Sequence, residues 1–452
     1  MNLFLKENKQ LLLLALPLIV NYFIEGCPNF INNAMIAHLG QTELAAGAIV
    51  SSAFTTMIVF FYGLLSAAST LISHHYGEKK NREIGEVIRD ACVIGIFCSI
   101  LLIAILANGG ALLRLMGQSE ALIILATPYL HGLIFAVIPD FGTMILWQFF
   151  IGLGRPKVTL VSSILYVPIN ILANYTLMFG KFGFPQLDML GIGLGTAFAY
   201  TVLFIGFIVY IFFQPQYRGY FNLRLFNFQH WHINSLIKVG LPMGIIWMID
   251  LSFSLFAASF AGKLSTLWLA AQQVSVQAAG LTFMVVAGLS QAISIRIGHT
   301  WHSNNVQVTK MICGIGVLIC CFIPFLFSLI FWFRPLWIIG IDFDLSAPQN
   351  VAVIKLATEF LAIFGFYQII NSLRYAFFSA LRAMKDTYFS ALCSLIGFYG
   401  IAIGCGYFLL FHWHGTLFQF WYLTIFALCL IVVALYGRLR HHLKRRETAA
   451  LS

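Results

Sequence analysis

The chain has 452 residues, of which 60% are hydrophobic and only 9% are charged, and its formal net charge is +10. Soluble domains carry about 25% charged residues, so this composition excludes a soluble globular protein and indicates a lipid bilayer as the solvent. The basic net charge could suggest nucleic acid binding, but the placement of the basic residues described below predicts no nucleic acid partner.

The hydropathy pattern predicts helices, because a membrane-spanning helix needs about 20 mostly apolar residues. Twelve such stretches follow one another along the chain, at roughly 10–37, 43–75, 86–108, 121–152, 157–179, 190–213, 235–262, 266–299, 309–333, 350–381, 386–411 and 415–437. Short segments of alternating hydrophobicity, which are typical of membrane β-barrels, do not occur. We therefore predict an all-α polytopic membrane protein with twelve transmembrane helices.

The second half of this pattern repeats the first. A shift of 225 residues places Leu16-Pro17 on Leu241-Pro242 and Gly63-Leu64 on Gly288-Leu289, and a shift of 228 residues aligns later helices. The repeat predicts two pseudo-symmetric six-helix lobes, at 1–213 and 235–437, with a cytoplasmic linker at 214–234 and a basic cytoplasmic tail at 438–452. Because six is an even number, both lobes enter the membrane from the same side, as in parallel-repeat transporters that work by alternating access.

The Lys and Arg residues predict the orientation of the chain. With the N-terminus inside, 20 of the 26 basic residues lie at the inner ends of the spans, five lie at the outer ends, and Arg374 lies within a span. Inner loops of membrane proteins carry an excess of basic residues. We therefore predict a plasma (inner) membrane protein with both termini in the cytoplasm, where contact with anionic lipid is a secondary use of the charge.

Two acidic residues occupy equivalent positions in the repeat. The shift of 225 places Glu25 on Asp250, and each lies inside a predicted span. An ionisable residue at the centre of a membrane helix costs about 2.5–3.5 kcal/mol on insertion scales and is commonly functional. We predict that both acids couple transport to an ion. The alternative is a neutral or paired acid with a structural role.

Further polar residues are candidates for the lining of a substrate cavity. Asn29 and Asn32 share the helical face of Glu25, because residues three and four apart lie on one side of a helix. The other candidates are Asp140, Tyr166, Asn170, Asn174, Ser254, Gln368, Asn371 and Arg374. For the amides, hydrogen bonding between helices is the alternative. Arg374 needs an acidic partner, for which Asp250, Glu359 and Asp140 are candidates, and an ion pair that only locks the second lobe is its alternative.

Gly191, Gly193 and Gly195 open an apolar span with no strand before them. A phosphate-binding loop follows a strand, so we predict that these glycines let helices pack closely. The sequence predicts no cofactor and no metal site.

Several motifs resemble those of the multidrug and toxic compound extrusion (MATE) family. In chain order they are His38-Leu39-Gly40, Leu44-Ala45-Ala46, Phe182-Gly183-Phe184-Pro185, Gly240-Leu241-Pro242 with an acid eight residues after the proline, Leu269-Ala270-Ala271-Gln272-Gln273-Val274, Ile295-Arg296-Ile297-Gly298, and Ala380-Leu381-Arg382 with Lys385-Asp386-Thr387. Together they cover nearly the whole chain in the family's order, which makes the resemblance specific as a set.

The resemblance implies two six-helix lobes in a V shape, and export of amphipathic, mostly cationic small molecules in exchange for H+ or Na+. Asp250 falls on the family's acidic position in the seventh helix, and Asn170 and Asn174 fall on its polar pair in the fifth. The family's acids in the first and tenth helices fall on Asn32 and Asn371. These two amides weaken the case for a sodium site, so we expect proton coupling, with sodium as the alternative.

We therefore expect a monomeric secondary active antiporter and not an enzyme. A lipid-linked oligosaccharide flippase of the wider superfamily is one alternative, although it would favour more cavity cations than Arg374. A membrane-embedded acyl or glycosyl transferase is another, and it would need a His or Asp cluster near one interface. A passive channel is the third, and it would show flux without gradient-driven exchange.

Overall fold

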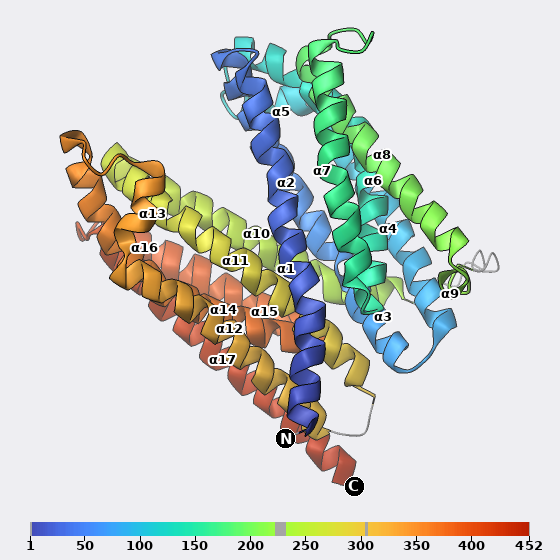
Figure 1. Cartoon of the computed structure of the whole chain (residues 1–452). Coiled ribbons are helices and arrows are strands. Elements are labelled where there is room, and N and C mark those ends of the chain that lie inside the picture. The colour runs from blue at the N-terminus through green and yellow to red at the C-terminus, as the bar shows by residue number, and fades with distance from the viewer. Residues whose placement is uncertain (1, 222–231, 303–305, 452) are drawn as a thin grey trace. The chain divides into compact units, whose positions relative to one another are not determined.

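Helices make up almost all of the chain that the structure describes. The structure is a computed structural model that describes residues 2–221, 232–302 and 306–451 (Figure 1). The helices of the first half are α1 (Asn2–Ala37), α2 (Gln41–Leu65), α3 (Ala67–Gly77), α4 (Asn81–Ala107), α5 (Gly109–Leu115), α6 (Glu120–Gly152), α7 (Pro156–Phe179), α8 (Asp188–Phe213) and α9 (Pro215–Arg218). Those of the second half are α10 (Ile233–Leu264), α11 (Thr266–Thr300), α12 (Val306–Phe333), α13 (Pro335–Asp342), η2 (Pro348–Asn350), α14 (Val351–Ala383), α15 (Thr387–Leu395), η3 (Ile396–Cys405), α16 (Gly406–Phe411) and α17 (Leu417–Leu451).

Twelve segments of the described residues are long and apolar enough to cross a membrane, which confirms the predicted all-α, twelve-span fold class. The second span joins α2 and α3, and the eleventh joins α15, η3 and α16. The η3 segment is a π-helix that contains Gly397, Gly400 and Gly404. Since glycine is a weak α-helix former, this stretch is a local weak point where a π-helical insertion is tolerated.

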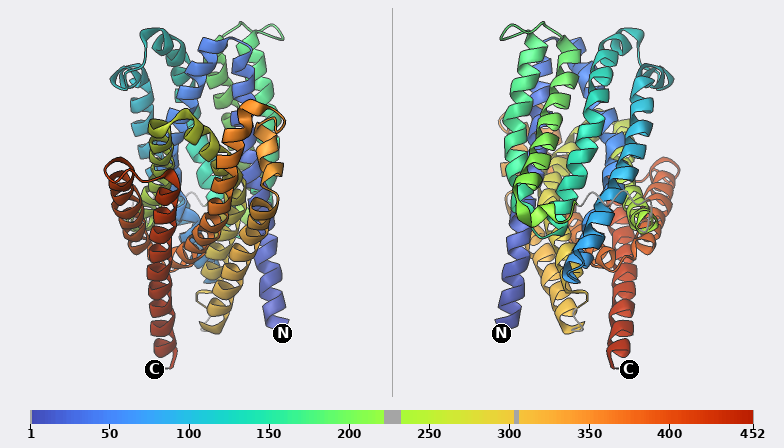
Figure 2. Two further views of the ribbon diagram at one scale, coloured as in Figure 1. Left: turned by 90° about the vertical axis from the view of Figure 1, so that its left-hand side faces the viewer. Right: turned by 90° about the vertical axis from the view of Figure 1, so that its right-hand side faces the viewer.

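The first and last helices extend beyond the predicted spans. Helix α1 begins at Asn2, and the residues predicted as a basic tail continue α17 to Leu451 (Figure 2). Leu, Lys, Arg, Glu and Ala are strong helix formers. The extension of α17 also contacts the end of α11 and the first turns of α12. The Arg446 guanidinium lies 4.0 Å from the ring centre of Trp301, and Lys310 pairs with Glu447. Of the predicted linker 214–234, residues 222–231 lie outside the described residues.

The described chain divides by internal packing into two units, which we call unit 1 (Met1–Tyr22 with Ile245–Ser452) and unit 2 (Phe23–Gly244). The division passes through the middle of α1 and of α10. These two helices are equivalent in the sequence repeat, so the chain leaves one unit and enters the other at matching places. The domain boundaries predicted at residues 213 and 235 stay a prediction about the membrane lobes.

In unit 2, α6 lies at the centre and packs against α2, α3, α4 and α8, while α8 also packs against α7. The three glycines of α8 make this packing possible. A Cβ atom on Gly193 would lie 2.7 Å from the Gly132 Cα of α6, and one on Gly191 would lie 2.6 Å from the Leu177 carbonyl carbon of α7. A Cβ on Gly195 would overlap Asn174 Oδ1. The glycines therefore serve close helix packing, as the sequence predicted.

In unit 1, α14 has the central place and packs against α11, α12 and α17. Polar bonds join α14 to α12: Trp332 Nε1 donates to the Ala362 carbonyl oxygen at 2.9 Å, and Ser328 Oγ donates to the Gly365 carbonyl oxygen at 2.7 Å. A Cβ on Gly365 would lie under 3 Å from the Trp332 indole, at 2.8 Å from Cε2. Small residues thus bring helices together in both units, as is common in membranes.

An ion-pair cluster around Asp386, which lies between the tenth and eleventh spans, joins the start of α15 to α17. Asp386 Oδ2 accepts hydrogen bonds from Arg438 Nε at 2.7 Å and from His442 Nε2 at 2.6 Å. Burial opposes the ionisation of Asp386, but these two bonds outweigh it and hold the pKa of the carboxyl below its usual value.

The glycine contacts predict that Gly195→Ala destabilises the protein by about 1–3 kcal/mol, the scale of overpacking a tight core. The added methyl displaces the Asn174 side chain, whereas Gly206→Ala on the same helix meets no atom within 4 Å and is the matched control. Thermal unfolding of both variants in detergent measures the difference. Equal unfolding temperatures for Gly195→Ala and Gly206→Ala would contradict the packing role.

The lowered pKa of Asp386 predicts a pH-dependent contribution to stability. The folded state favours the ionised carboxyl, so the contribution is present above the unfolded pKa of about 4 and is lost as the pH falls through the lower folded value. The unfolding temperature of Asp386→Asn should therefore lie below that of the wild type at neutral pH, and the gap should close on acidification. A variant of the exposed Asp342, Asp342→Asn, is the control.

Candidate ion-coupling and substrate site

The candidate site of unit 1 is an ion pair between α10 and α14. Arg374 Nη2 donates to both carboxylate oxygens of Asp250, at 3.0 Å to Oδ1 and 2.9 Å to Oδ2. Tyr375 Oη donates to Asp250 Oδ2 at 2.5 Å. The Asp250 side chain keeps 21% of its surface exposed, whereas that of Arg374 keeps only 4%. Of the three acids predicted as partners of Arg374, Asp250 is the one that pairs with it.

The rest of the Arg374 guanidinium is also held. Nε donates to Asn371 Oδ1 at 2.9 Å, and Nη1 lies 3.5 Å from Ser394 Oγ. The rings of Tyr375 and Phe398 lie 4.5 and 5.1 Å from the guanidinium carbon, close enough for cation–π attraction. Three polar partners and two aromatic faces therefore offset the cost of burying this charge.

Two predicted residues of unit 1 lie outside this cluster. Gln368 faces α12 instead: its Nε2 donates to Ser328 Oγ at 2.7 Å and to the Pro324 carbonyl oxygen at 3.2 Å. Ser254 is exposed. The serine that makes a contact is Ser252, whose Oγ lies 2.7 Å from Tyr399 Oη. The contacts of Gln368 are those of a residue that joins two helices.

The candidate site of unit 2 centres on Asp140 of α6, which is 1% exposed. Tyr62 Oη of α2 donates to Asp140 Oδ1 at 2.5 Å. The second oxygen, Oδ2, is buried and has no hydrogen-bond partner among the described residues. Asp140 thus accepts a bond from a hydroxyl, whereas Asp250 accepts bonds from a guanidinium and a hydroxyl. Among the described residues, no cationic side chain lies within ion-pair distance of Asp140.

A second group of candidates in unit 2 is a chain of amides that joins α1, α7 and α8. Asn174 Nδ2 donates to Asn32 Oδ1 at 2.8 Å and to Asn170 Oδ1 at 3.1 Å. Asn170 Nδ2 lies 3.4 Å from Tyr166 Oη and 3.3 Å from Thr196 Oγ1. The structure therefore brings together four predicted residues, Asn32, Tyr166, Asn170 and Asn174, and buries all of them. We call Asn32, Asn170 and Asn174 the amide cluster.

Glu25 and Asn29 are exposed on α1 in the part of that helix that belongs to unit 2. Glu25 lies close enough to Asp140 for the two carboxylates to interact electrostatically. The candidates of unit 2 therefore comprise one buried acid, one exposed acid and a neutral amide cluster.

Tyr62, Tyr375, Thr196 and Ser394 were not predicted from the sequence. A tyrosine or serine in an apolar helix gives a weak signal, because most such side chains bond to their own helix or face lipid. For Tyr375 the adjacent Arg374 was the only signal available.

The MatE family model matches residues 17–176 and 242–408 of the chain. The chain belongs to the MATE family. It is thus a multi-pass membrane transporter and not an enzyme, as the sequence motifs indicated. A relative from Mesorhizobium japonicum, named "Probable multidrug resistance protein NorM", is 29% identical over 92% of this chain and 90% of its own length. One of the same name from Brucella suis is 27% identical over 98% of this chain and 95% of its own length.

Solved structures share the fold. A structure described as MATE in the bent conformation matches with a TM-score of 0.87 and 15% identity, covering 100% of this chain and 99% of its own. The eukaryotic MATE transporter AtDTX14 matches with a TM-score of 0.81 and 20% identity, covering 99% of this chain and 100% of its own. At these identities the likeness establishes the MATE fold.

The burial of Arg374 predicts the outcome of a double-mutant cycle. Asp250→Asn leaves a buried guanidinium without its counter-ion and should cost about 3–5 kcal/mol of unfolding free energy. Arg374→Gln should cost less, because Asp250 is partly exposed. The double variant Asp250→Asn/Arg374→Gln should lose less than the sum of the two, by about 0.5–3 kcal/mol. Additive losses, measured by unfolding in detergent, would mean that the pair contributes nothing as a pair.

Proposed function

We propose that this MATE transporter is a proton-coupled antiporter that exports amphipathic, mostly cationic organic compounds. The proposal of multidrug export is supported by the names of its relatives, which are called probable multidrug resistance proteins. The proposal of proton coupling is supported by the charge distribution in the two candidate sites, and above all by the ion pair between Asp250 and Arg374.

In unit 1, a sodium ion would have to compete with a resident cation. The Arg374 guanidinium already occupies both oxygens of Asp250, and Asn371, where one branch of the family has an acid, already accepts a bond from Arg374 Nε. A sodium site requires oxygen ligands that are free to coordinate. A proton requires a single carboxylate oxygen, and transfer of a proton to Asp250 would release Arg374.

In unit 2, the only buried acid among the candidate residues is Asp140. The amide cluster supplies neutral oxygens where prokaryotic members commonly have an acid in the first helix. An ionised carboxylate inside the membrane is costly unless a cation or several donors are close to it. Asp140 has one donor, Tyr62, so protonation relieves its burial cost. We propose Asp140, with Glu25 beside it, as the second proton-binding position.

Coupling requires that protonated and ionised forms favour different conformations, because a ligand shifts an equilibrium only through its differential affinity for the two states. Release of Arg374 from Asp250 would remove the ion pair between α10 and α14 and leave the Tyr375 hydroxyl bonded to Asp250. Helix α10 is one of the two helices that pass between the units. Proton binding would thus loosen unit 1 at the helix that connects it to unit 2. When the proton leaves, the Asp250 carboxylate would regain its negative charge, and a cationic substrate would be attracted to it.

We further propose a monomer in the plasma (inner) membrane, with both termini in the cytoplasm. The orientation is supported by the distribution of basic residues, 20 of which lie at the inner ends of the spans against five at the outer ends. A sodium-coupled antiporter is the alternative that the same experiment tests.

The proposal predicts dye efflux from proteoliposomes under an imposed pH gradient and not under a sodium gradient of equal size. Purified protein reconstituted with a fluorescent lipophilic cation gives the rate directly. Equal rates under the two gradients, or efflux driven by sodium alone, would contradict proton coupling while leaving export itself established.

In the same assay Asp250→Asn should lower proton-driven efflux to the rate of empty vesicles. Because this variant also loses stability, Asp250→Asn/Arg374→Gln tests the loss of the carboxyl in a background without the unpaired guanidinium. Asp140→Asn should also lower the rate. Glu359→Gln, at an exposed acid of α14, is the control and should retain wild-type rates. Full efflux by the double variant would remove Asp250 from the mechanism.

A further inference from the structure

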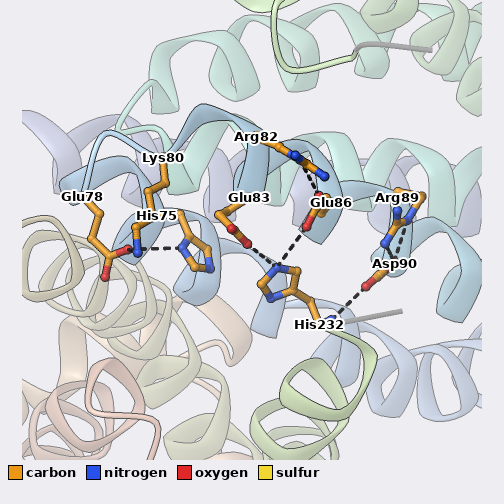
Figure 3. A network of polar contacts seen from close by, with 9 residues as sticks. All are labelled: His75, Glu78, Lys80, Arg82, Glu83, Glu86, Arg89, Asp90 and His232. Carbon is orange, nitrogen blue, oxygen red and sulfur yellow. Dashed lines mark hydrogen bonds and ion pairs between the residues drawn. The ribbon is translucent and has the colours of Figure 1, made fainter. Parts of the chain in front are cut away.

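Outside the two candidate sites, the structure brings two histidines and an acid together at one end of unit 2. His75 lies in the last turns of α3, Glu83 lies in the first turn of α4, and His232 immediately precedes α10 (Figure 3). One ligand atom from each of the three residues lies within 4.8 Å of the others. We propose that His75, Glu83 and His232 form a binding site for a divalent transition metal, with Zn²⁺ as the ion that fits best.

The residue types favour zinc. Zn²⁺ prefers imidazole nitrogen and carboxylate oxygen at about 2.0–2.2 Å, and two histidines with one glutamate is a recognised zinc ligand set. His232 Nε2 lies 2.9 Å from Glu83 Oε2, so these two atoms are already about as close as two ligands of one tetrahedral ion. Magnesium and calcium prefer all-oxygen sites, which the two imidazoles do not provide.

A fourth ligand is available from the same helix. Glu86 lies three residues after Glu83, and its Oε2 lies 3.8 Å from His232 Nε2. Residues three apart share one face of a helix. The other oxygen of Glu86 accepts a bond from Arg82 Nε at 3.0 Å, which fixes the carboxylate without using Oε2. Glu86 or a water molecule would therefore complete a tetrahedral site.

A further acid lies at ion-pair distance from one of the imidazoles. Glu78 Oε2 lies 3.6 Å from His75 Nδ1, and the second ring nitrogen of His75 points toward His232 (Figure 3). A carboxylate on the distal nitrogen of a histidine ligand fixes the ring and raises its basicity as a ligand. Lys80 Nζ holds the same carboxylate oxygen at 2.8 Å. The arrangement thus places a carboxylate that could serve as an outer partner beside the proposed ligands.

The proposed site lies where α10 begins, so a bound metal ion would affect how the start of this helix is held. The backbone nitrogen of His232 donates to Asp90 Oδ2 at 3.0 Å, so the residue before α10 is already tied to α4. A metal ion would add a bond from His232 to α3 and α4 at the base of a helix that passes between the two units. Bound Zn²⁺ would therefore restrain the start of α10. This inference does not rest on the proposed direction or coupling of transport.

Isothermal titration of the purified full-length protein with Zn²⁺, after removal of metals by a chelator and with no polyhistidine tag, tests the site. We expect one saturable Zn²⁺ per chain and no saturation by Mg²⁺. His75→Ala, His232→Ala and Glu83→Gln should each weaken binding more than tenfold, since even outer partners of metal ligands contribute about 10–100-fold. His412→Ala, at an exposed histidine in another part of the chain, is the matched control.

Thermal unfolding provides the second measurement and does not depend on transport. Zn²⁺ should raise the unfolding temperature of the wild type and of His412→Ala, and it should leave that of His75→Ala/His232→Ala unchanged. Equal zinc affinity in the wild type and the double variant would overturn the proposal. Failure of the wild type to bind zinc would also overturn the proposal. This holds even if His232→Ala is less stable than the wild type, because the cluster would then act only as an ion pair.

Discussion

The ion pair between Asp250 and Arg374 is the interaction on which the second half of this protein depends. A charge in the membrane interior is tolerated only where other groups replace its water. Arg374 has the Asp250 carboxylate, the Asn371 amide, the Ser394 hydroxyl and two ring faces around it. This concentration of partners links α10, α14 and the eleventh span at one point. Under the proposed function, this pair is one of the two places where a proton would bind.

The two halves repeat in sequence, but they differ in charge at one pair of matching positions in α6 and α14. Under the shift of 228, Gln368 of α14 is the counterpart of Asp140 of α6. Gln368 joins its helix to α12 through Ser328, whereas Asp140 accepts one bond from Tyr62 and keeps an unpaired oxygen. One half thus places a neutral side chain where the other places an acid. Because of this asymmetry, the two proposed proton-binding positions lie in different polar surroundings.

Helix packing by small residues makes these polar contacts possible. Gly195 lets α8 approach α7 so closely that Asn174 lies directly against it, and Asn174 in turn reaches Asn32 on α1. In lipid no hydrophobic force draws apolar helices together, so close backbone approach and side-chain hydrogen bonds take its place. The amide cluster is therefore both a packing element of unit 2 and a lining candidate for its site. Neither role excludes the other.

The sequence by itself determined the solvent, the helical class, the twelve spans, the internal repeat and the family, because each depends on local hydropathy or on motifs read along the chain. It also indicated the close packing at Gly191, Gly193 and Gly195, since no strand precedes them. It did not determine that Arg374 pairs with Asp250 and not with Glu359, or that Tyr62 bonds Asp140. Nor did it join His75 to His232, which are far apart in the chain. Those contacts depend on which faces of distant helices meet. The sequence around a single polar residue in an apolar helix does not indicate which residue it will contact. Only the tertiary structure decides it, by bringing the two side chains within hydrogen-bond distance.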